Sequence, residues 1–267
     1  MTKNSDSKKQ SDDSSDVEHS VVDMLLSKST VQTLDSENMI LETQKRVWGA
    51  LKKGYEYSGV ANESEEFLRK NVFSKLNMVV LYVDLVGSTT MTLEMPGDKI
   101  AIIISSFAQE MASVIRQHHG YVLKFVGDAV IGYFDAEENG LLASDNAVAS
   151  AKSMISVIQK GINPILNQYD YPDLRVKIGV DFGQNFVVRY GADVKYSQVD
   201  LMGSAMNIAA KIQSMAKPNQ ILIGGDVYQK IHPSLQKEFN QIIWENNEWK
   251  YRSRVTGELY EVYELHN

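Results

Sequence analysis

The run YVLKFVGDAVIGYF, residues 121–134, is the stretch around which the fold of this chain is built. Two apolar segments rich in strand-forming residues, 121–126 and 129–134, flank the pair Gly127-Asp128. This pattern predicts a β-hairpin with a tight turn. Gly127 supplies the backbone freedom that such a turn needs, and Asp128 is expected at the tip with its carboxylate facing outward.

A second acidic residue, Asp84, ends another apolar run, MVVLYV at 78–83. Two aspartates at strand ends predict a site for Mg²⁺ or Mn²⁺, because such hard cations bind carboxylate oxygens together with substrate phosphates. Asp84 is followed by a turn of small residues that leads into a predicted helix, where backbone N–H groups can bind phosphate. The candidate phosphate-binding residues of this turn are Gly87, Ser88 and Thr89.

Composition narrows the class of protein. The chain has 267 residues, of which 43% are hydrophobic and 23% charged, which suits one large domain or one domain with extensions. A net charge of −7 argues against a nucleic-acid-binding surface over the whole protein. The absence of cysteine excludes disulfides and thiolate chemistry. No apolar run is long enough for a membrane span and no signal peptide opens the chain, so we expect a cytoplasmic protein.

The first 75 residues are predicted to lie outside the main domain. Residues 1–20 are mostly Ser, Asp and Lys, and are expected to be disordered because they cannot bury enough apolar surface. They form either a solubilising tail or a docking segment. Residues 21–75 are predicted to be a helical extension, with helices at 35–57 and 63–71. This extension is either a signalling or dimerisation element or a segment packed on the following domain.

From residue 76 to 267 predicted strands and helices alternate. The order fits an α+β ferredoxin-like sandwich, a mainly antiparallel sheet with helices packed on it. Gly183-Gln184 is interpreted as a hairpin turn between two strands, and residues 191–201 as a loop. The expected strands are 78–84, 121–126, 129–134, 174–182, 185–190, 220–223, 239–244, 249–255 and 259–265, and the expected helices are 96–118, 141–168 with an interruption at 163–164, and 203–215.

Three segments resemble the signature segments of class III nucleotidyl cyclase catalytic domains, the adenylate/guanylate cyclase family. They are YVDLVGST (82–89), LKFVGDAVIGYF (123–134) and DLMGSAMNIAAKI (200–212), and the resemblance covers about residues 76–265. It implies that Asp84 and Asp128 hold two Mg²⁺ or Mn²⁺ ions, with the Leu85 carbonyl as a further ligand. It also implies that Lys124 and Asp200 select the base, as in adenylate-type members.

The resemblance assigns three more residues. Asn207 matches the asparagine that orients the ribose. Lys211 stands where the family usually has an arginine, so we expect activity below that of an arginine-bearing enzyme, because lysine lacks the planar bidentate fork. Arg254 falls where a lysine often binds the terminal phosphates.

The implied reaction converts ATP to 3′,5′-cyclic AMP and pyrophosphate in intracellular signalling. Adenine offers an acceptor at N1 and a donor at its 6-amino group, which Lys124 and Asp200 can match, whereas guanine presents the opposite pattern. The resemblance further implies a homodimer with shared sites, in which Asp84, Lys124 and Asp128 of one chain face Asp200, Asn207 and Lys211 of the other. The alternatives are a regulatory module that binds nucleotide or a partner without turnover, and a cyclase using GTP or a pyrimidine triphosphate.

Overall fold

The computed structural model describes residues 36–52, 62–244, 249–253 and 256–266. The predicted polar tail, the first part of the predicted extension (21–35) and Arg254 lie outside the described residues. The helices are a helix at 36–52, α2 (Asn62–Lys70), α3 (Ser88–Glu94), α4 (Gly97–Gln117), α5 (Gly140–Ser156), α6 (Asn163–Leu166), α7 (Ser204–Met215), α8 (Gly225–Tyr228) and α9 (Pro233–Gln236).

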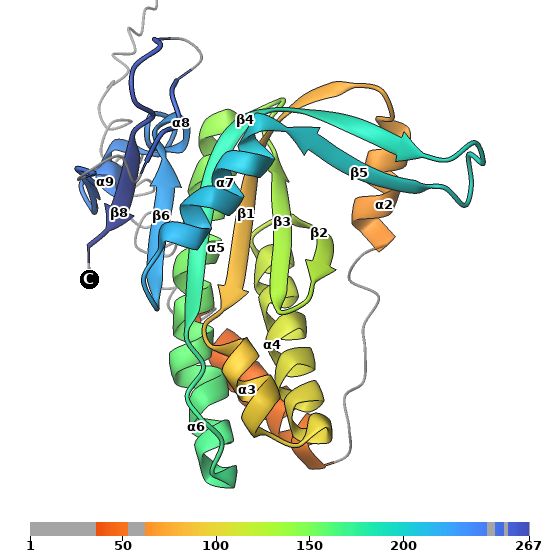
Figure 1. Ribbon diagram of the computed structural model, residues 1–267, viewed down its shortest axis with the longest axis vertical. Helices are drawn as coiled ribbons and strands as arrows, with labels where there is room; N and C mark the ends of the chain where they lie inside the picture. Colours follow the sequence, from red (N-terminus) through yellow and green to blue (C-terminus); the bar gives the residue numbers. More distant parts are fainter. Residues whose placement is uncertain (1–35, 53–61, 245–248, 254–255, 267) are drawn as a thin grey trace, which may run out of the picture.

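The described residues form one eight-stranded sheet in the order β2-β3-β1-β4-β6-β8-β7, with β5 pairing β4 off this path. The pairings are antiparallel except for the parallel pair of β4 and β6, which confirms the expected mainly antiparallel α+β architecture (Figure 1). The strands are β1 (Lys75–Leu85), β2 (Tyr121–Val126), β3 (Ala129–Asp135), β4 (Val176–Tyr190), β5 (Gln198–Gly203), β6 (Gln220–Gly224), β7 (Phe239–Gln241) and β8 (Val262–Leu265).

The predicted hairpin is present as β2 and β3. Val126 pairs with Ala129, and the two residues between them form the turn. Gly127 has a φ of 62°, in the left-handed region that glycine adopts without steric cost. The turn therefore projects Asp128 from the end of the hairpin, as the sequence predicts.

β1 is buried on both faces, which explains why its sequence is almost continuously apolar rather than alternating. Val79, Leu81 and Val83 pack in the core formed with α4 and α5. Met78 and Val80 point to the opposite face, where they pack with residues of α7 and α2. The sheet is thus a middle layer with helices on each side (Figure 1).

The predicted turn at Gly183-Gln184 is wrong, because β4 runs without a break for 15 residues. Gly183 and Gln184 pair with Met78 and Asn77 of β1. A Cβ at Gly183 would lie 3.2 Å from the Cβ of Ala205, and one at Gly179 would lie 2.4 Å from the backbone nitrogen of Gln213. Glycine at these positions therefore marks the close approach of α7 to the strand and not a turn.

The predicted loop 191–201 is also partly wrong, because β5 begins at Gln198. Its six residues pair with residues 185–190 of β4, most of which lie beyond the segment of β4 that pairs with β1. These two strand segments and the loop 191–197 between them form a hairpin that projects from the sheet, here called the arm (Figure 1). The alternation of apolar and polar residues that marks a strand is obscured here, because part of the arm lies beyond the region where helices cover the two faces of the sheet.

Two other expected elements differ from the structure in extent. The helix predicted for 141–168 changes type rather than stopping, since a π-helix (Val157–Ile162) and a 3₁₀ turn (Asn167–Tyr169) continue it. The C-terminal strands are shorter than predicted, and the region expected to form strand 249–255 contributes an isolated bridge between Arg252 and Leu259. Short strands at a sheet edge carry a weak periodic signal.

The described part of the N-terminal extension packs on the domain. The helix at 36–52 buries Val47 and Ala50 against the α4–α5 side, where Glu110 accepts hydrogen bonds from Thr43 Oγ1 at 2.7 Å and Arg46 Nε at 2.8 Å. α2 covers the opposite face of the sheet. In the described ranges, no helix has the length and apolar character to cross a bilayer.

A buried acid lies on β4, away from the strand-end aspartates. Asp181 is 1% exposed, and its Oδ1 accepts a hydrogen bond of 2.6 Å from the Tyr260 hydroxyl. Burial raises the pKa of Asp181 well above its ordinary value. The folded state keeps this proton over a pH range in which the unfolded chain has lost it. The free energy of unfolding contributed by Asp181 therefore falls as pH rises from the ordinary aspartate pKa, about 3.9, through the raised one.

We predict that Asp181→Asn removes this slope, because the amide keeps the acceptor for Tyr260 and carries no charge. Urea unfolding at several pH values between about 5 and 8 should show the variant gaining stability relative to wild type as pH rises. Tyr260→Phe serves as the control, and should cost about 1–3 kcal/mol by leaving the buried carboxyl without its donor. Parallel pH curves for wild type and Asp181→Asn would contradict the assignment.

Candidate active site

Asp84 and Asp128 lie at the same end of the sheet. Asp84, the penultimate residue of β1, pairs across the ladder with Ala129, which directly follows Asp128. Burial and the negative charge of Asp128 raise the pKa of Asp84. Gln213 Nε2 on α7 donates to Asp84 Oδ2 at 3.2 Å, and Lys177, opposite Asp84 on β4, partly offsets the shift. The structure thus brings the two predicted carboxylates together.

These two carboxylates fit a hard divalent cation. Each is partly buried, and their mutual repulsion is what a bound cation would relieve. Leu85, whose carbonyl was expected to add a ligand, is the last residue of β1. Within the described ranges, no three His, Cys, Asp or Glu side chains gather as a metal site. The remaining coordination positions would therefore be filled by main-chain oxygen, water or phosphate oxygens, as is usual for Mg²⁺.

The predicted phosphate-binding turn follows β1 directly. Gly87 has a φ of 78° and caps the N-terminus of α3 without a side-chain hydrogen bond. Ser88 and Thr89 form the first turn of α3, and both Gly87 and Thr89 are exposed. The turn is anchored to the sheet because the Val86 N–H donates to the Arg175 carbonyl at 2.8 Å. It leaves the first N–H groups of α3 facing solvent next to Asp84 in sequence.

Lys124 and Asp200 form an ion pair of 2.5 Å between Lys124 Nζ and Asp200 Oδ2. Lys124 comes from β2, after a register shift between Val122 and Lys124, and Asp200 comes from β5 of the arm. The pair is assembled within one chain. The expectation that these two residues face one another from opposite subunits is therefore wrong, because Asp200 on β5 contacts Lys124 on β2 of the same chain.

Tyr82 also belongs to this region, although the sequence analysis did not select it. It lies two residues before Asp84, so the alternation of β1 places both side chains on the face covered by α7. Burial and the charge of Asp200 raise the pKa of Tyr82, which places its phenol near that carboxylate. The period of two along β1 is the signal that could have identified it.

Asn207 and Lys211 are exposed on α7, whereas Gln213 on the same helix is buried against Asp84. At about 100° per residue, Lys211 and Gln213 project nearly opposite ways. Lys211 therefore points away from the carboxylates of its own chain. Asn207 lines a groove whose other lining residues are Lys75, Gln184, Asn185, Phe186, Met202, Gly203 and Ser204.

The predicted site residues thus fall into two groups in one chain. The first is the strand-end carboxylates with the following turn, and the second is the Lys124–Asp200 pair with the exposed side of α7. Gln213 was missed because a polar residue on the apolar stripe of a helix carries no motif of its own. Arg254, the expected phosphate ligand, lies outside the described residues.

Comparisons with known proteins place these residues in context. A family model described as the adenylate and guanylate cyclase catalytic domain matches residues 72–262. A cytidylate cyclase of Staphylococcus aureus is 27% identical over 174 residues, which is 62% of this chain and 40% of that protein. A cytidylate cyclase of Escherichia coli is 25% identical over 160 residues, which is 57% of this chain and 35% of that protein. The chain thus spans well under half the length of these relatives.

Solved structures share the fold. The adenylyl cyclase CyaB from P. aeruginosa matches with a TM-score of 0.58 and 18% identity, over 73% of this chain and 95% of that one. The guanylyl cyclase Cya2 matches with a TM-score of 0.61 and 18% identity, over 73% and 93%. At this level of identity the structures establish the fold alone. Because the family model covers most of the chain, this protein belongs to the adenylate/guanylate cyclase catalytic domain family.

Proposed function

We propose that this chain is a nucleotidyl cyclase that converts ATP into 3′,5′-cyclic AMP and pyrophosphate. The observation that carries the proposal is the Lys124–Asp200 ion pair, which holds a donor and an acceptor side by side. The adjacent carboxylates Asp84 and Asp128 supply the matching cation site. Membership of the cyclase family supports the reaction class, while the preference for a base with an exocyclic amino group over guanine and uracil rests on this pair.

CTP is a second candidate substrate, because two of the relatives are cytidylate cyclases. The chemistry of the pair agrees with either base. Cytosine presents an acceptor at N3 and a donor at its 4-amino group, the same order as N1 and the 6-amino group of adenine. Guanine and uracil present a donor and a carbonyl acceptor in the reverse order. Lys124 and Asp200 therefore favour bases that carry this amino group over GTP and UTP.

The proposed reaction is an in-line attack of the ribose 3′-oxygen on the α-phosphorus, which expels pyrophosphate. Two divalent cations, when bound, lower the pKa of the 3′-hydroxyl and stabilise the triphosphate charge. Asp84 and Asp128 would hold them, and the N–H groups after Gly87 would contact phosphate oxygens. Asn207 would orient the ribose, and Lys211 would place positive charge near the transferred phosphate. Lysine neutralises that charge with less geometric constraint than arginine.

The placement of Lys211 supports a site shared between two chains. It projects from the side of α7 nearly opposite Gln213, so it cannot serve the carboxylates that Gln213 contacts in the same chain. We propose a homodimer in which Asp84 and Asp128 of one chain meet Lys124, Asp200, Asn207 and Lys211 of the other. Compared with the division expected from the sequence, Lys124 moves to the group that contains Asp200.

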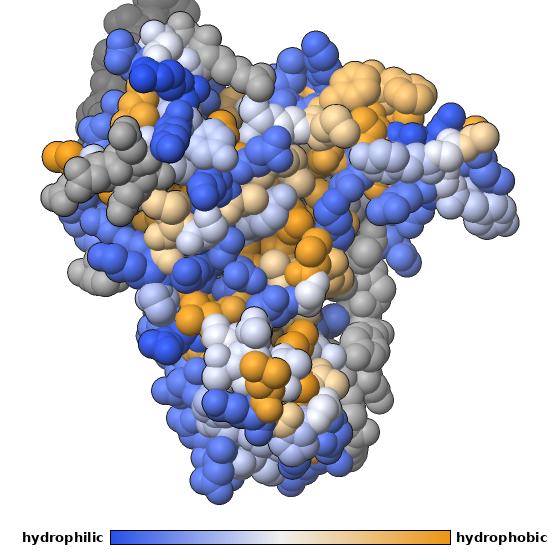
Figure 2. Space-filling view, viewed as in Figure 1, coloured by the Kyte–Doolittle hydropathy of each residue, from blue (hydrophilic) through white to orange (hydrophobic). Residues whose placement is uncertain are grey.

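Exposed apolar surface near the site residues supports the dimer. Figure 2 shows apolar surface in the middle of the face that carries α7. Three large apolar residues close to the site residues in sequence are exposed, namely Phe125 (42%), Val126 (52%) and Met202 (57%). Phe125 and Val126 adjoin Lys124, and Met202 lies between Asp200 and Asn207. A second copy would cover such surface, in keeping with the apolar character of homodimer interfaces.

The first prediction concerns the reaction itself. Purified protein incubated with ATP, GTP, CTP or UTP and Mg²⁺ or Mn²⁺ should form cyclic AMP, or cyclic CMP, identified by mass spectrometry. Asp128→Ala should reduce product by at least about 100-fold because a cation ligand is lost. Asp173→Ala, which removes an exposed carboxylate on a loop, is the matched control and should be as active as wild type. No product from any triphosphate with folded protein would favour a non-catalytic binding module.

The second prediction concerns the base. The double variant Lys124→Glu/Asp200→Lys keeps an ion pair but reverses its donor and acceptor. It should shift the ratio of kcat/KM for ATP and CTP against GTP and UTP by at least about tenfold toward the latter. Lys124→Glu alone is the comparison, because it places two carboxylates in contact and should weaken binding of all four. An unchanged preference in the double variant would refute the assignment of the base-reading pair.

The third prediction concerns the shared site. Asp84→Ala and Asn207→Ala chains, each inactive alone, should regain roughly a quarter of wild-type activity when mixed, because half the dimers then contain one intact site of two. Mixing Asp84→Ala with Asp128→Ala is the control and should restore nothing, since both changes damage the same half. Activity in neither mixture, with subunit exchange demonstrated by a tagged pull-down, would argue against sharing.

A further inference from the structure

α2 (Asn62–Lys70) lies outside the part of the chain that the family model matches, which begins at residue 72. It packs on the face of the sheet that carries the base-reading pair and contacts both strands from which that pair comes. Lys124 is on β2, and Asp200 is on β5 of the arm. Because α2 contacts both strands, it is placed to affect the position of Lys124 relative to Asp200.

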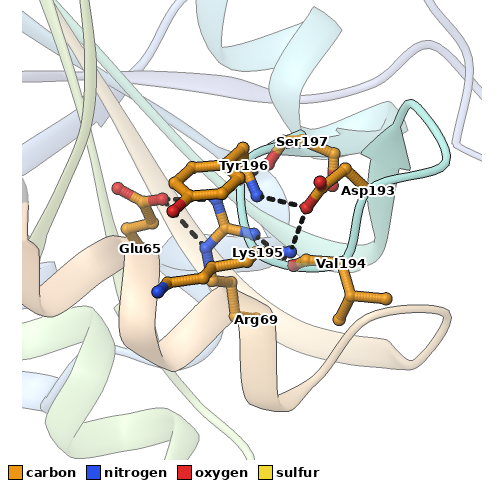
Figure 3. A network of polar contacts seen from close by, with 7 residues as sticks. All are labelled: Glu65, Arg69, Asp193, Val194, Lys195, Tyr196 and Ser197. Carbon is orange, nitrogen blue, oxygen red and sulfur yellow. Dashed lines mark hydrogen bonds and ion pairs between the residues drawn. The ribbon is translucent and has the colours of Figure 1, made fainter.

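Arg69 of α2 joins the helix to the arm. Its Nη1 donates to the Val194 carbonyl at 2.9 Å and its Nη2 to the Ser197 carbonyl at 2.8 Å (Figure 3). Glu65, one turn earlier, accepts from Arg69 Nε at 2.9 Å and from Nη2 at 2.5 Å. Glu65 of the same helix therefore orients the guanidinium, while both of its terminal nitrogens donate hydrogen bonds to the loop of the arm.

The loop that Arg69 grips is internally ordered. The Asp193 side-chain Oδ1 accepts from the N–H groups of Lys195 at 2.7 Å and Tyr196 at 2.9 Å, and its carbonyl accepts from the Ser197 N–H at 3.1 Å (Figure 3). These hydrogen bonds hold the pKa of Asp193 below its ordinary value. The hydrogen bonds that hold the Val194 and Ser197 carbonyls therefore also restrain the start of β5, which begins at the next residue.

The other side of α2 contacts the strand that carries Lys124. Phe67 stacks on Tyr121 of β2 with ring centroids 5.0 Å apart. Leu68 is 1% exposed in a core cluster that includes Leu201, the neighbour of Asp200, and Ile131, the ladder partner of Lys124. One turn of α2 thus contacts the surroundings of both members of the pair.

The strand pairing of the arm is limited, although its base is held by backbone hydrogen bonds of Val187 with Phe73 and Ser74 and by the buried side chains of Val187 and Leu201. Among the described strands, β5 pairs with β4 alone, and the paired segments lie beyond the β1–β4 ladder for all but two residues of β4. Asp200 sits in the middle of this projecting hairpin, opposite Val188. Strand pairing holds β5 through β4 alone, so the contacts that α2 makes with β5 contribute to the position of Asp200 relative to Lys124.

We infer that Arg69 is a positioning residue, which fixes the arm so that Asp200 meets Lys124 at the base of the substrate. This inference rests on the proposed function of the Lys124–Asp200 pair. Arg69 is not among the residues proposed to contact the base or the phosphates. Its removal should therefore affect how well the base is bound and discriminated, while the binding of the triphosphate group stays the same.

The test compares wild type, Arg69→Ala, Arg69→Lys and the control Lys70→Ala, which removes the same charge from the next, exposed residue of α2. In Arg69→Ala the KM for the preferred nucleoside triphosphate should rise roughly tenfold with little change in kcat. The preference for that base over the poorest one should fall by a similar factor. The Ki of inorganic tripolyphosphate, which has no base, should be unchanged. Arg69→Lys should restore part of the loss, because an ammonium can donate to one of the two carbonyls.

A KM and base preference in Arg69→Ala equal to those of Lys70→Ala would overturn the inference. An equal loss of affinity for tripolyphosphate would also overturn it, because the damage would then extend beyond base recognition. Amide hydrogen exchange over residues 198–203 provides a readout that needs no turnover, and it should be faster in Arg69→Ala than in the other three proteins. If wild type forms no cyclic nucleotide, the proposed function fails, while unchanged exchange in Arg69→Ala would refute the positioning role separately.

Discussion

The structure depends on one constraint, the antiparallel pairing of β1 with β3 and β4. β1 is apolar on both faces, so it can be stable only as a central strand with helices on each side. Its ladder with β3 sets Asp84 opposite Ala129 and so brings Asp84 to the turn that carries Asp128. A shift of one residue in this register would turn Asp84 to the opposite face and separate the two carboxylates. The proximity of the two carboxylates is therefore a consequence of the sheet register.

A second constraint follows from how closely α7 lies on β4. Gly179 and Gly183 leave no room for a side chain between strand and helix, and the helix backbone approaches accordingly. This approach buries Gln213 against Asp84 and leaves Asn207 and Lys211 on the exposed side. The same helix thus stabilises one carboxylate of its own chain and presents polar groups outward. In the proposed dimer, the carboxylates of one copy and the exposed α7 side chains of the other would together form one reaction centre.

α2, which lies outside the family-matched residues, is connected to the arm. β5 projects from the sheet, and its contacts with α2 combine a buried leucine with a guanidinium held by two main-chain carbonyls. Hydrogen bonds to main-chain carbonyls depend on loop geometry rather than on loop sequence. The contacts of α2 therefore depend on the main-chain geometry of the arm, and Asp200 of the arm pairs with Lys124. The described N-terminal helix α2 is in this way connected to the Lys124–Asp200 ion pair through the arm.

The sequence by itself determined the hairpin at 121–134, the strand before Asp84, the long helices and the α+β class, because each is encoded by a local period or a glycine turn. Three sequence motifs also indicated which side chains are candidates for the proposed cyclase site. Tertiary structure decided the meaning of Gly183, since a glycine needed for helix approach and one needed for a turn look alike in sequence. It decided that Lys124 and Asp200 pair within one chain, a contact between residues 76 apart in the sequence. It also revealed Gln213 and Arg69, whose partners lie far along the chain or on the main chain, where no residue pattern records them, and it showed that Tyr82 lies near Asp200.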